Sequence, residues 1–203
     1  MTLAVVVLAA GASRRLGEPK ALARIGDRTA LQHLALAART LTGGPRTLVV
    51  TGAHHEEIAA HVEASALDVD VAHNPDWAQG RTGSVAVGAA ARPGMDLVVA
   101  PIDAPLVPGE VFEALEREWK ARGAPLAGWL APATDGGSRY GHPVVLGREL
   151  ARSAAALPPD TPLRHVRSGA DSLFRVDVES LAIHDDLDEP TDLQALRRRV
   201  TER

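Results

Sequence analysis

The N-terminal segment, residues 3–20, constrains the fold more than any other part of the chain. Leu3–Ala9 is a short, uninterrupted apolar run, which is typical of a parallel strand buried on both faces. The run then breaks into Ala10-Gly11-Ala12-Ser13-Arg14-Arg15-Leu16-Gly17-Glu18-Pro19-Lys20. Small residues there leave backbone N–H groups free to point at phosphate oxygens, and cationic side chains stand in the same loop. Because open α/β sheets bind ligands at the carboxyl ends of their strands, this segment predicts a nucleoside triphosphate site.

Two familiar glycine motifs do not match this loop. In the dinucleotide-binding fingerprint the glycines stand close together, whereas here Arg14 and Arg15 separate Gly11 from Gly17. A Walker A loop ends in Gly-Lys-Ser/Thr, and Gly17 is followed by Glu-Pro-Lys. The alternative is an ordinary polar loop between a strand and a helix. The compact order of strand, small residues, paired arginines, glycine and Pro-Lys favours the phosphate site.

The rest of the chain alternates between apolar strands and amphipathic helices. Strands are expected at 46–51, 69–72 and 96–101, and helices at 30–41, 56–66, 85–91 and 108–122. This alternation predicts βαβ units and a mostly parallel sheet. After Gly123 the expected strands are 126–131, 143–146, 174–178 and 181–184, with a loop at 135–141, two short helices on either side of 158–162, and a closing helix at 190–200. We expect a single domain over residues 1–203.

Composition excludes several classes of function. The 203 residues contain 45% hydrophobic side chains and no apolar run as long as a membrane span. The absence of cysteine excludes a disulfide framework and thiolate metal sites. A net charge of −4 argues against general nucleic-acid binding. No basic segment precedes Leu3, so the N-terminus predicts a strand and not a signal peptide, and we expect a cytoplasmic protein.

Three aspartates are candidate metal ligands. Asp103 follows the apolar segment 97–100, so its carboxylate is expected at the carboxyl edge of the sheet. Asp186 and Asp188 are two residues apart and face the same way in an extended segment. Magnesium is held by one or two carboxylates together with phosphate oxygens. The alternative is structural, since aspartates also cap loops and favour helix N-termini.

The N-terminal motif resembles the signature of the MobA/MocA-type nucleotidyltransferases, the molybdenum cofactor guanylyl- and cytidylyltransferases and their relatives. The matching residues are Leu8–Gly11, Ser13, Arg15, Leu16, Gly17 and Lys20. Further blocks follow in the family's order: 74–80 with Ser84, 103–105, 141–143 and 186–190. The resemblance covers nearly the whole chain. It implies an α/β fold, a three-layer α/β/α Rossmann-like (GT-A-like) nucleotidyltransferase with a mostly parallel central sheet.

The resemblance also implies roles for particular residues. Arg15, Lys20 and Asp103 are expected to be catalytic, with Mg²⁺ on Asp103, Asp188 and Asp186. The expected nucleotide-binding residues are Leu8, Ala9, Ala10, Gly11, Ser13, Arg15, Lys20, Gly80 and Ser84. The expected acceptor-binding residues are Gly141, His142 and Pro143. Residues 1–122 then form a nucleotide-binding half and residues 123–203 an acceptor-binding half. Two alternatives stay open: Trp77 as a core anchor and His142 as a buried structural histidine.

The substrates are expected from the same resemblance. Leu-Ala-Ala-Gly accompanies cytidylyl transfer in the family and Leu-Ala-Gly-Gly guanylyl transfer, and Ala10 places this chain with the first group. We therefore expect CTP and a molybdopterin-like phosphorylated acceptor, with a molybdoenzyme or its chaperone as a further partner. The alternatives are transfer from GTP, a sugar phosphate as the acceptor, and a non-catalytic carrier of nucleotide or pterin. Intact Arg15, Lys20 and Asp103 favour an enzyme over a carrier.

Overall fold

The computed structural model describes residues 2–41, 43–158 and 160–202, and within them the chain forms an eight-stranded sheet. At its centre β1 (Leu3–Ala9) lies parallel to β6 (Asp96–Pro101) on one side and to β4 (Thr47–Thr51) on the other. β5 (Val69–His73) extends the parallel arrangement beyond β4. The buried N-terminal strand that the sequence predicts is confirmed, and every residue of β1 is buried.

The second half of the chain continues the same sheet. β9 (Val144–Leu146) is antiparallel to both β6 and β7 (Gly128–Thr134), and β10 (Ser172–Asp177) lies parallel to β7 at the edge. A short strand, β8 (Arg139–Tyr140), pairs with the end of β7. The strand order is β10-β7-β9-β6-β1-β4-β5. The prediction of a mostly parallel α/β sheet is therefore confirmed, with β9 as a reversed strand at the junction of the halves.

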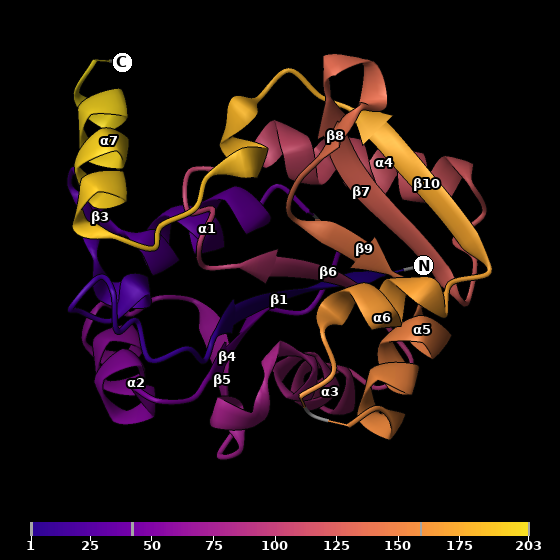
Figure 1. Ribbon diagram of the computed structural model, residues 1–203, viewed down its shortest axis with the longest axis horizontal. Helices are drawn as coiled ribbons and strands as arrows, with labels where there is room; N and C mark the ends of the chain where they lie inside the picture. Colours follow the sequence, from indigo (N-terminus) through magenta and orange to yellow (C-terminus); the bar gives the residue numbers. More distant parts are fainter. Residues whose placement is uncertain (1, 42, 159, 203) are drawn as a thin grey trace.

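Helices cover both faces of the sheet (Figure 1). Their bounds are α1 (Ala30–Ala38), α2 (His55–Ala64), α3 (Arg81–Ala91), α4 (Gly109–Ala121), α5 (Arg148–Ser153), α6 (Leu163–Ser168) and α7 (Pro190–Thr201). Alternation along β1 supplies two cores, because Val5 and Val7 face one side and Val6 the other. The first core includes Leu31 of α1, and the second includes Val85 of α3. This is the three-layer arrangement that the sequence predicts.

Local sequence explains where the helices begin. Thr29 and Gln32 form a capping box at α1, in which the Thr29 amide donates to Gln32 Oε1 at 2.9 Å. In α4 the buried residues recur at helical spacing, and Trp119 Nε1 donates to Asp96 Oδ2 at 3.0 Å. The buried carboxylate of Asp96 also accepts from the Arg148 amide at the start of α5. These contacts join helices on opposite faces to the strand that leads into Asp103.

Several short elements refine the predicted arrangement. They are the 3₁₀ turns η1 (Lys20–Leu22), η2 (Trp77–Gln79), η3 (Asp135–Gly137), η4 (Ala154–Ala156) and η5 (Leu181–His184), and the small hairpin β2 (Arg24–Ile25) and β3 (Arg28–Thr29). The strand predicted at 181–184 is wrong. Ser180 Oγ accepts from the Ala182 amide and starts the η5 turn, which buries the consecutive residues Ala182 and Ile183.

The start of α3 also differs from the prediction. Gly80 caps α3, and the helix begins at Arg81, four residues before the predicted start at Val85. Gly80 has a φ of 146°, which glycine adopts without steric cost. In the part of the chain that the structure describes, no helix has the length and apolar character needed to cross a membrane.

Candidate active site

The loop after β1 folds back on itself at the carboxyl edge of the sheet. Ser13 Oγ accepts from the Lys20 amide at 3.1 Å, and the Ser13 carbonyl accepts from the Gly17 amide at 3.1 Å. Ser13 and Gly17 both have positive φ values, of 50° and 82°. This tight turn brings Arg15 and Lys20 to the same side of the sheet edge. An extended loop would place these two cations farther apart.

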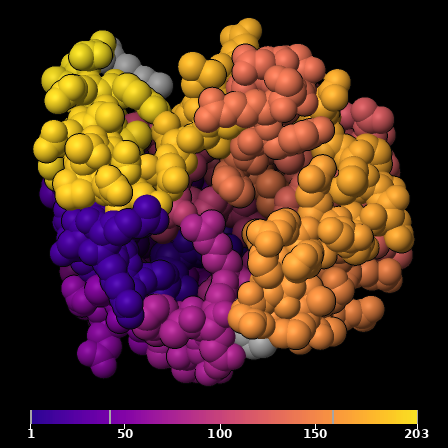
Figure 2. Space-filling view, in the orientation of Figure 1, coloured from indigo at the N-terminus to yellow at the C-terminus, as the bar shows by residue number. Residues whose placement is uncertain are grey.

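A cavity of 330 Å³ lies at this edge, and we call it the β1 cavity. Figure 2 shows the surface hollowed where the indigo N-terminal segment meets the later parts of the chain. All nine residues predicted to bind a nucleotide line it: Leu8, Ala9, Ala10, Gly11, Ser13, Arg15, Lys20, Gly80 and Ser84. Asp103 and Asp188 line the same cavity. The fold thus brings together residues from four separate blocks of the sequence.

Cations and carboxylates are paired throughout the β1 cavity. Lys20 Nζ donates to Asp103 Oδ1 at 2.6 Å and to Asp188 Oδ1 at 2.5 Å. Arg15 donates to the second oxygen of Asp188, and Arg81 donates to Asp103 Oδ2 at 2.8 Å. The hydrogen bond from Lys20 lowers the pKa of Asp188, because it stabilises the charged carboxylate. Lys20 and Asp103 are only 11% and 14% exposed, so water screens this pair weakly.

Asp103, Asp186 and Asp188 form a cluster that fits a divalent cation. One carboxylate oxygen from each lies within 4.8 Å of the others. Burial raises the pKa of Asp186, and the charges of Asp188 and Asp103 raise it further. Carboxylate oxygens are the ligands that Mg²⁺ and Mn²⁺ prefer. The donor set and the mutual repulsion of the carboxylates therefore both suit such an ion.

The segment before α7 is held firmly beside Asp103. The Leu187 amide donates to the Asp103 carbonyl at 2.9 Å, and the Leu187 side chain is buried. The amides of Asp188 and Glu189 both donate to Asp192 Oδ2, within the capping box of α7. Asp185 accepts two hydrogen bonds from Arg199, of 2.6 and 2.9 Å. Asp185 and Asp192 therefore have structural roles. Asp186 and Asp188 lie near Asp103 and are the candidate metal ligands of this segment.

The wall of the β1 cavity beside Ala10 is close-packed. A Cβ on Gly52 would lie 2.4 Å from the Ala10 carbonyl oxygen and 2.5 Å from Trp77 Cβ. Trp77 is half-buried and lines the cavity, so it combines packing with an exposed ring. Ser84 is buried, and its Oγ accepts from Asn74 Nδ2 at 3.0 Å. By contrast, a Cβ on Gly11 would meet no atom within 4 Å, so protein packing does not require glycine there.

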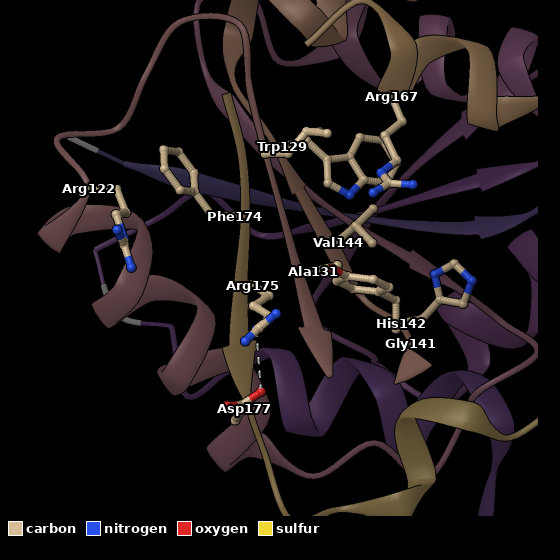
Figure 3. A pocket seen from close by; sticks show the side chains of 12 residues that line it. Arg122, Trp129, Ala131, Gly141, His142, Val144, Arg167, Phe174, Arg175 and Asp177 are labelled. Carbon is tan, nitrogen blue, oxygen red and sulfur yellow. Dashed lines mark ion pairs between the residues drawn. The ribbon is translucent and has the colours of Figure 1, made fainter. Parts of the chain in front are cut away.

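The predicted acceptor residues lie at a second, larger cavity. We call it the β10 cavity; its volume is 660 Å³, and it lies over β7, β9 and β10 (Figure 3). Gly141 and His142 line it, whereas Pro143 is buried and lines neither cavity. His142 Nδ1 is buried without a hydrogen-bond partner in the described residues. Burial lowers the pKa of His142, and the nearby Arg81 charge lowers it further.

Arg81 and His54 also line the β1 cavity, and neither was predicted to be a site residue. Arg81 is 65% exposed and pairs with Asp103, yet it stands directly after Gly80 in the matched block, which was the available signal. His54 Nε2 donates to the Ala12 carbonyl at 3.1 Å, and its Nδ1 faces Glu57 Oε1 at 2.9 Å. Burial lowers the pKa of His54, but these two hydrogen bonds outweigh it and the net pKa is raised. No local pattern around His54 indicated this contact.

Known proteins resemble the chain over most of its length. The molybdenum cofactor cytidylyltransferase of Escherichia coli is 26% identical over 197 residues, which are 97% of this chain and 96% of that protein. The bifunctional protein GlmU of Xanthobacter autotrophicus is 37% identical over 156 residues, 73% of this chain. The matched part is only 33% of that longer protein.

Solved structures share the fold. Rv0371c of Mycobacterium tuberculosis superimposes with a TM-score of 0.75 at 25% identity, over 98% of this chain and 99% of that chain. Its complex with manganese gives 0.70 at 23% identity over the same shares. A CMP:2-keto-3-deoxy-manno-octonic acid synthetase complexed with CTP gives 0.76 at 15% identity, over 100% of this chain and 99% of that chain.

One family accounts for both the sequence blocks and the fold. The MobA-like NTP transferase domain matches residues 5–175, which include most of β1, its loop and the strand leading to Asp103. The Escherichia coli relative is named a cytidylyltransferase, and another solved structure of the same fold is described as a nucleotidyl transferase. The chain belongs to the MobA-like NTP transferase domain family and is a nucleotidyltransferase.

Proposed function

We propose that this chain is a magnesium-dependent cytidylyltransferase. It transfers the CMP moiety of CTP to a phosphorylated acceptor, molybdopterin, and releases pyrophosphate. The observation that carries the proposal is the β1 cavity, where a wall of small residues meets Arg15, Lys20, Asp103 and Asp188. Asp186 does not line the cavity, but its carboxylate lies near those of Asp103 and Asp188. The relative that matches over nearly its full length is a molybdenum cofactor cytidylyltransferase, which supports the choice of CTP and molybdopterin.

Arg15 and Lys20 bind the triphosphate in this proposal. Arginine offers a planar fork to two phosphate oxygens, and lysine acts as a compact charge. Both side chains are hydrogen-bonded to Asp188, so they exchange a carboxylate for phosphate oxygens when the nucleotide binds. Arg81 is placed to make the same exchange from Asp103. The cations thereby hold the α-phosphate in position for attack by the acceptor, and no covalent enzyme intermediate is needed.

Asp103, Asp186 and Asp188 would hold the magnesium ion. When bound, the ion neutralises charge on the triphosphate and on the departing pyrophosphate. Lys20 Nζ is bonded to one oxygen of Asp103 and one of Asp188, so these two oxygens would be available to hold the ion once Lys20 binds phosphate oxygens instead.

The base packs against Leu8–Gly11. Ala10 is 8% exposed, and its neighbour Gly52 keeps Trp77 tight against it. Because this wall is close-packed, it cannot move easily to make room for a larger ring. The single pyrimidine ring of cytosine therefore fits the wall better than the two rings of guanine.

The two halves of the chain divide the work. Residues 1–122 bind the nucleotide, and residues 123–203 bind the acceptor through Gly141 and His142, with Pro143 fixing the backbone beside them. The product then passes to a molybdoenzyme or its chaperone.

Product formation tests this proposal. The purified protein is incubated with Mg²⁺ and CTP or GTP, with and without molybdopterin, and pyrophosphate release and the mass of the product are measured. Pyrophosphate and a cytosine dinucleotide are expected only when CTP and molybdopterin are both present. Transfer from GTP alone would overturn the choice of nucleotide, and transfer only to a sugar phosphate would overturn the choice of acceptor. Binding of CTP or molybdopterin without any nucleotidyl transfer would favour the alternative of a non-catalytic carrier.

A further inference from the structure

The turn between β4 and α2 packs directly on the loop that follows β1. The Ala53 amide donates to the Ala10 carbonyl at 3.0 Å, and His54 Nε2 donates to the Ala12 carbonyl at 3.1 Å. A Cβ on Gly52 would lie 2.4 Å from the same Ala10 oxygen, so this close approach requires glycine in the turn. Two alternate carbonyls of the loop are therefore held toward the turn.

These contacts also orient the amides that follow the two carbonyls. In a trans peptide, the C=O of one residue and the N–H of the next point in opposite directions. Because the Ala10 and Ala12 carbonyls are directed to the turn, the Gly11 and Ser13 amides point away from it. Both residues line the β1 cavity, and within the described part of the chain neither amide donates a hydrogen bond. These two N–H groups are therefore available to phosphate oxygens.

His54 bridges this loop to α2. Its Nε2 faces the Ala12 carbonyl, and its Nδ1 lies 2.9 Å from Glu57 Oε1. A carbonyl and a carboxylate are both acceptors, so a neutral ring, which has a single N–H, satisfies only one of them. Both contacts are satisfied when the ring is an imidazolium. Burial lowers the pKa of His54, but the hydrogen bonds to Glu57 and to the Ala12 carbonyl outweigh it, and the net pKa is raised.

The charged groups around His54 leave Glu57 as its partner. Glu57 is 60% exposed and lies outside the cavity lining, so a bound phosphate does not have to displace it. Arg14 lines the cavity but is exposed, so water screens its charge. On the neighbouring strand, the ring of His73 stacks on His55 and not on His54. The other cations of the cavity are each paired with a carboxylate: Arg15, Lys20 and Arg81.

We propose that His54 is a positioning residue of the triphosphate site. As an imidazolium between Glu57 and the Ala12 carbonyl, it holds the Gly11 and Ser13 amides toward the cavity and adds a positive charge to the cavity wall. Loss of either ring proton frees one end of this bridge, so phosphate binding declines as the ring becomes neutral. The inference rests on the proposed function for the identity of the ligand as a triphosphate.

The pH dependence of phosphate binding tests the role of His54. Calorimetry measures the Kd for CTP with Mg²⁺ and for inorganic tripolyphosphate from about pH 6 to about pH 8.5, with the wild type and with His54→Gln. Glutamine keeps a donor but carries no charge, and comparison at each pH cancels the titration of the phosphates themselves. The Kd of the wild type should rise roughly tenfold more than that of His54→Gln over this range. Equal rises would overturn the inference.

Two exposed carboxylates of α2 provide matched variants. Glu56→Gln and Glu57→Gln remove the same charge from the same helical turn, but of the two only Glu57 bonds to His54. A general electrostatic effect would tighten the binding of tripolyphosphate in both variants, because a negative charge near an anion is lost. We expect Glu57→Gln instead to raise the Kd roughly threefold at about pH 7.5, since the ring then loses its proton more readily. Tighter or unchanged binding by Glu57→Gln would contradict the bridge.

The two probes separate this inference from the proposed function. Circular dichroism and melting temperature first establish that each variant is folded. Binding of tripolyphosphate that depends on His54, without binding of CTP, overturns the proposed function and supports the inference. Normal CTP binding with the same pH dependence in the wild type and in His54→Gln overturns the inference alone. If neither probe binds, both are overturned, because the loop is then not a phosphate site.

Discussion

The two cavities hold their charges in opposite ways. In the β1 cavity each of Arg15, Lys20 and Arg81 is hydrogen-bonded to a carboxylate, so the site is internally neutralised. In the β10 cavity Arg167 rests on an aromatic ring, and Arg175 is loosely paired. A ligand of the β1 cavity must therefore replace existing ion pairs, whereas a ligand of the β10 cavity adds new contacts. Replacing ion pairs in the β1 cavity couples the binding of metal to the binding of nucleotide. In the β10 cavity, the shape and charge of the ligand determine which ligand binds.

The largest expected effect comes from Asp103→Asn. Two cations and the proposed magnesium ion depend on this carboxylate, so turnover should fall by about 10²–10³-fold or more. Pyrophosphate release measures the loss. The matched variant Asp177→Asn in the β10 cavity should leave CTP affinity unchanged. Turnover of Asp103→Asn within threefold of the wild type would remove Asp103 from the metal site.

The next effect concerns the base. Ala10 is buried, and its carbonyl lies in a close-packed part of the cavity wall. One added methyl group against a ring costs about 1–3 kcal/mol. We expect kcat/KM to favour CTP over GTP by roughly ten- to a hundredfold, and Ala10→Gly to erode this preference without inverting it. Ala12→Gly, in the same loop but outside the cavity lining, is the control. A wild type that prefers GTP would contradict the cytidylyl assignment.

A smaller and opposite effect is expected for the metal alone. Lys20 Nζ occupies oxygens of Asp103 and Asp188, so it competes with a divalent ion when no nucleotide is present. Lys20→Met should tighten Mn²⁺ binding about tenfold, or about 1.4 kcal/mol, while weakening the binding of CTP. Electron paramagnetic resonance of free Mn²⁺ measures the first quantity. Lys120→Met, which removes the other lysine of the chain, should change neither. Weaker Mn²⁺ binding by Lys20→Met would show that the lysine does not compete.

The smallest effect concerns pH and His142, which lines the β10 cavity. Burial lowers the pKa of His142, so the unfolded chain takes up its proton first as the pH falls. The stability that the neutral ring contributes is present above about pH 6.5 and declines below it. Between pH 7.5 and 5.5 the melting temperature of the wild type should fall about 2–4 °C further than that of His142→Asn. His165→Asn, on the exposed face of α6, should follow the wild type. Parallel curves for wild type and His142→Asn would contradict the buried neutral ring.

Local sequence was sufficient for the strand and the loop that open the β1 cavity. The strand, the small residues and the cations lie within eighteen consecutive positions, and their alternation and spacing determine backbone shape with little help from distant contacts. The apolar segment before Asp103 placed that carboxylate at the sheet edge for the same reason. Helix starts were less well predicted, because the Gly80 cap and the η5 turn depend on single backbone amides and not on a periodic pattern.

The amino-acid sequence by itself determined the mostly parallel sheet, the buried first strand and the identity of the charged groups at its end. Only the tertiary structure decided that Lys20 bridges Asp103 and Asp188, which are far apart in the chain, and that Arg81 joins them. It also decided that Gly141 and His142, just before the reversed strand β9, line the β10 cavity and not the β1 cavity. Periodicity records which face of an element is apolar, but the strand order determines which distant side chains meet.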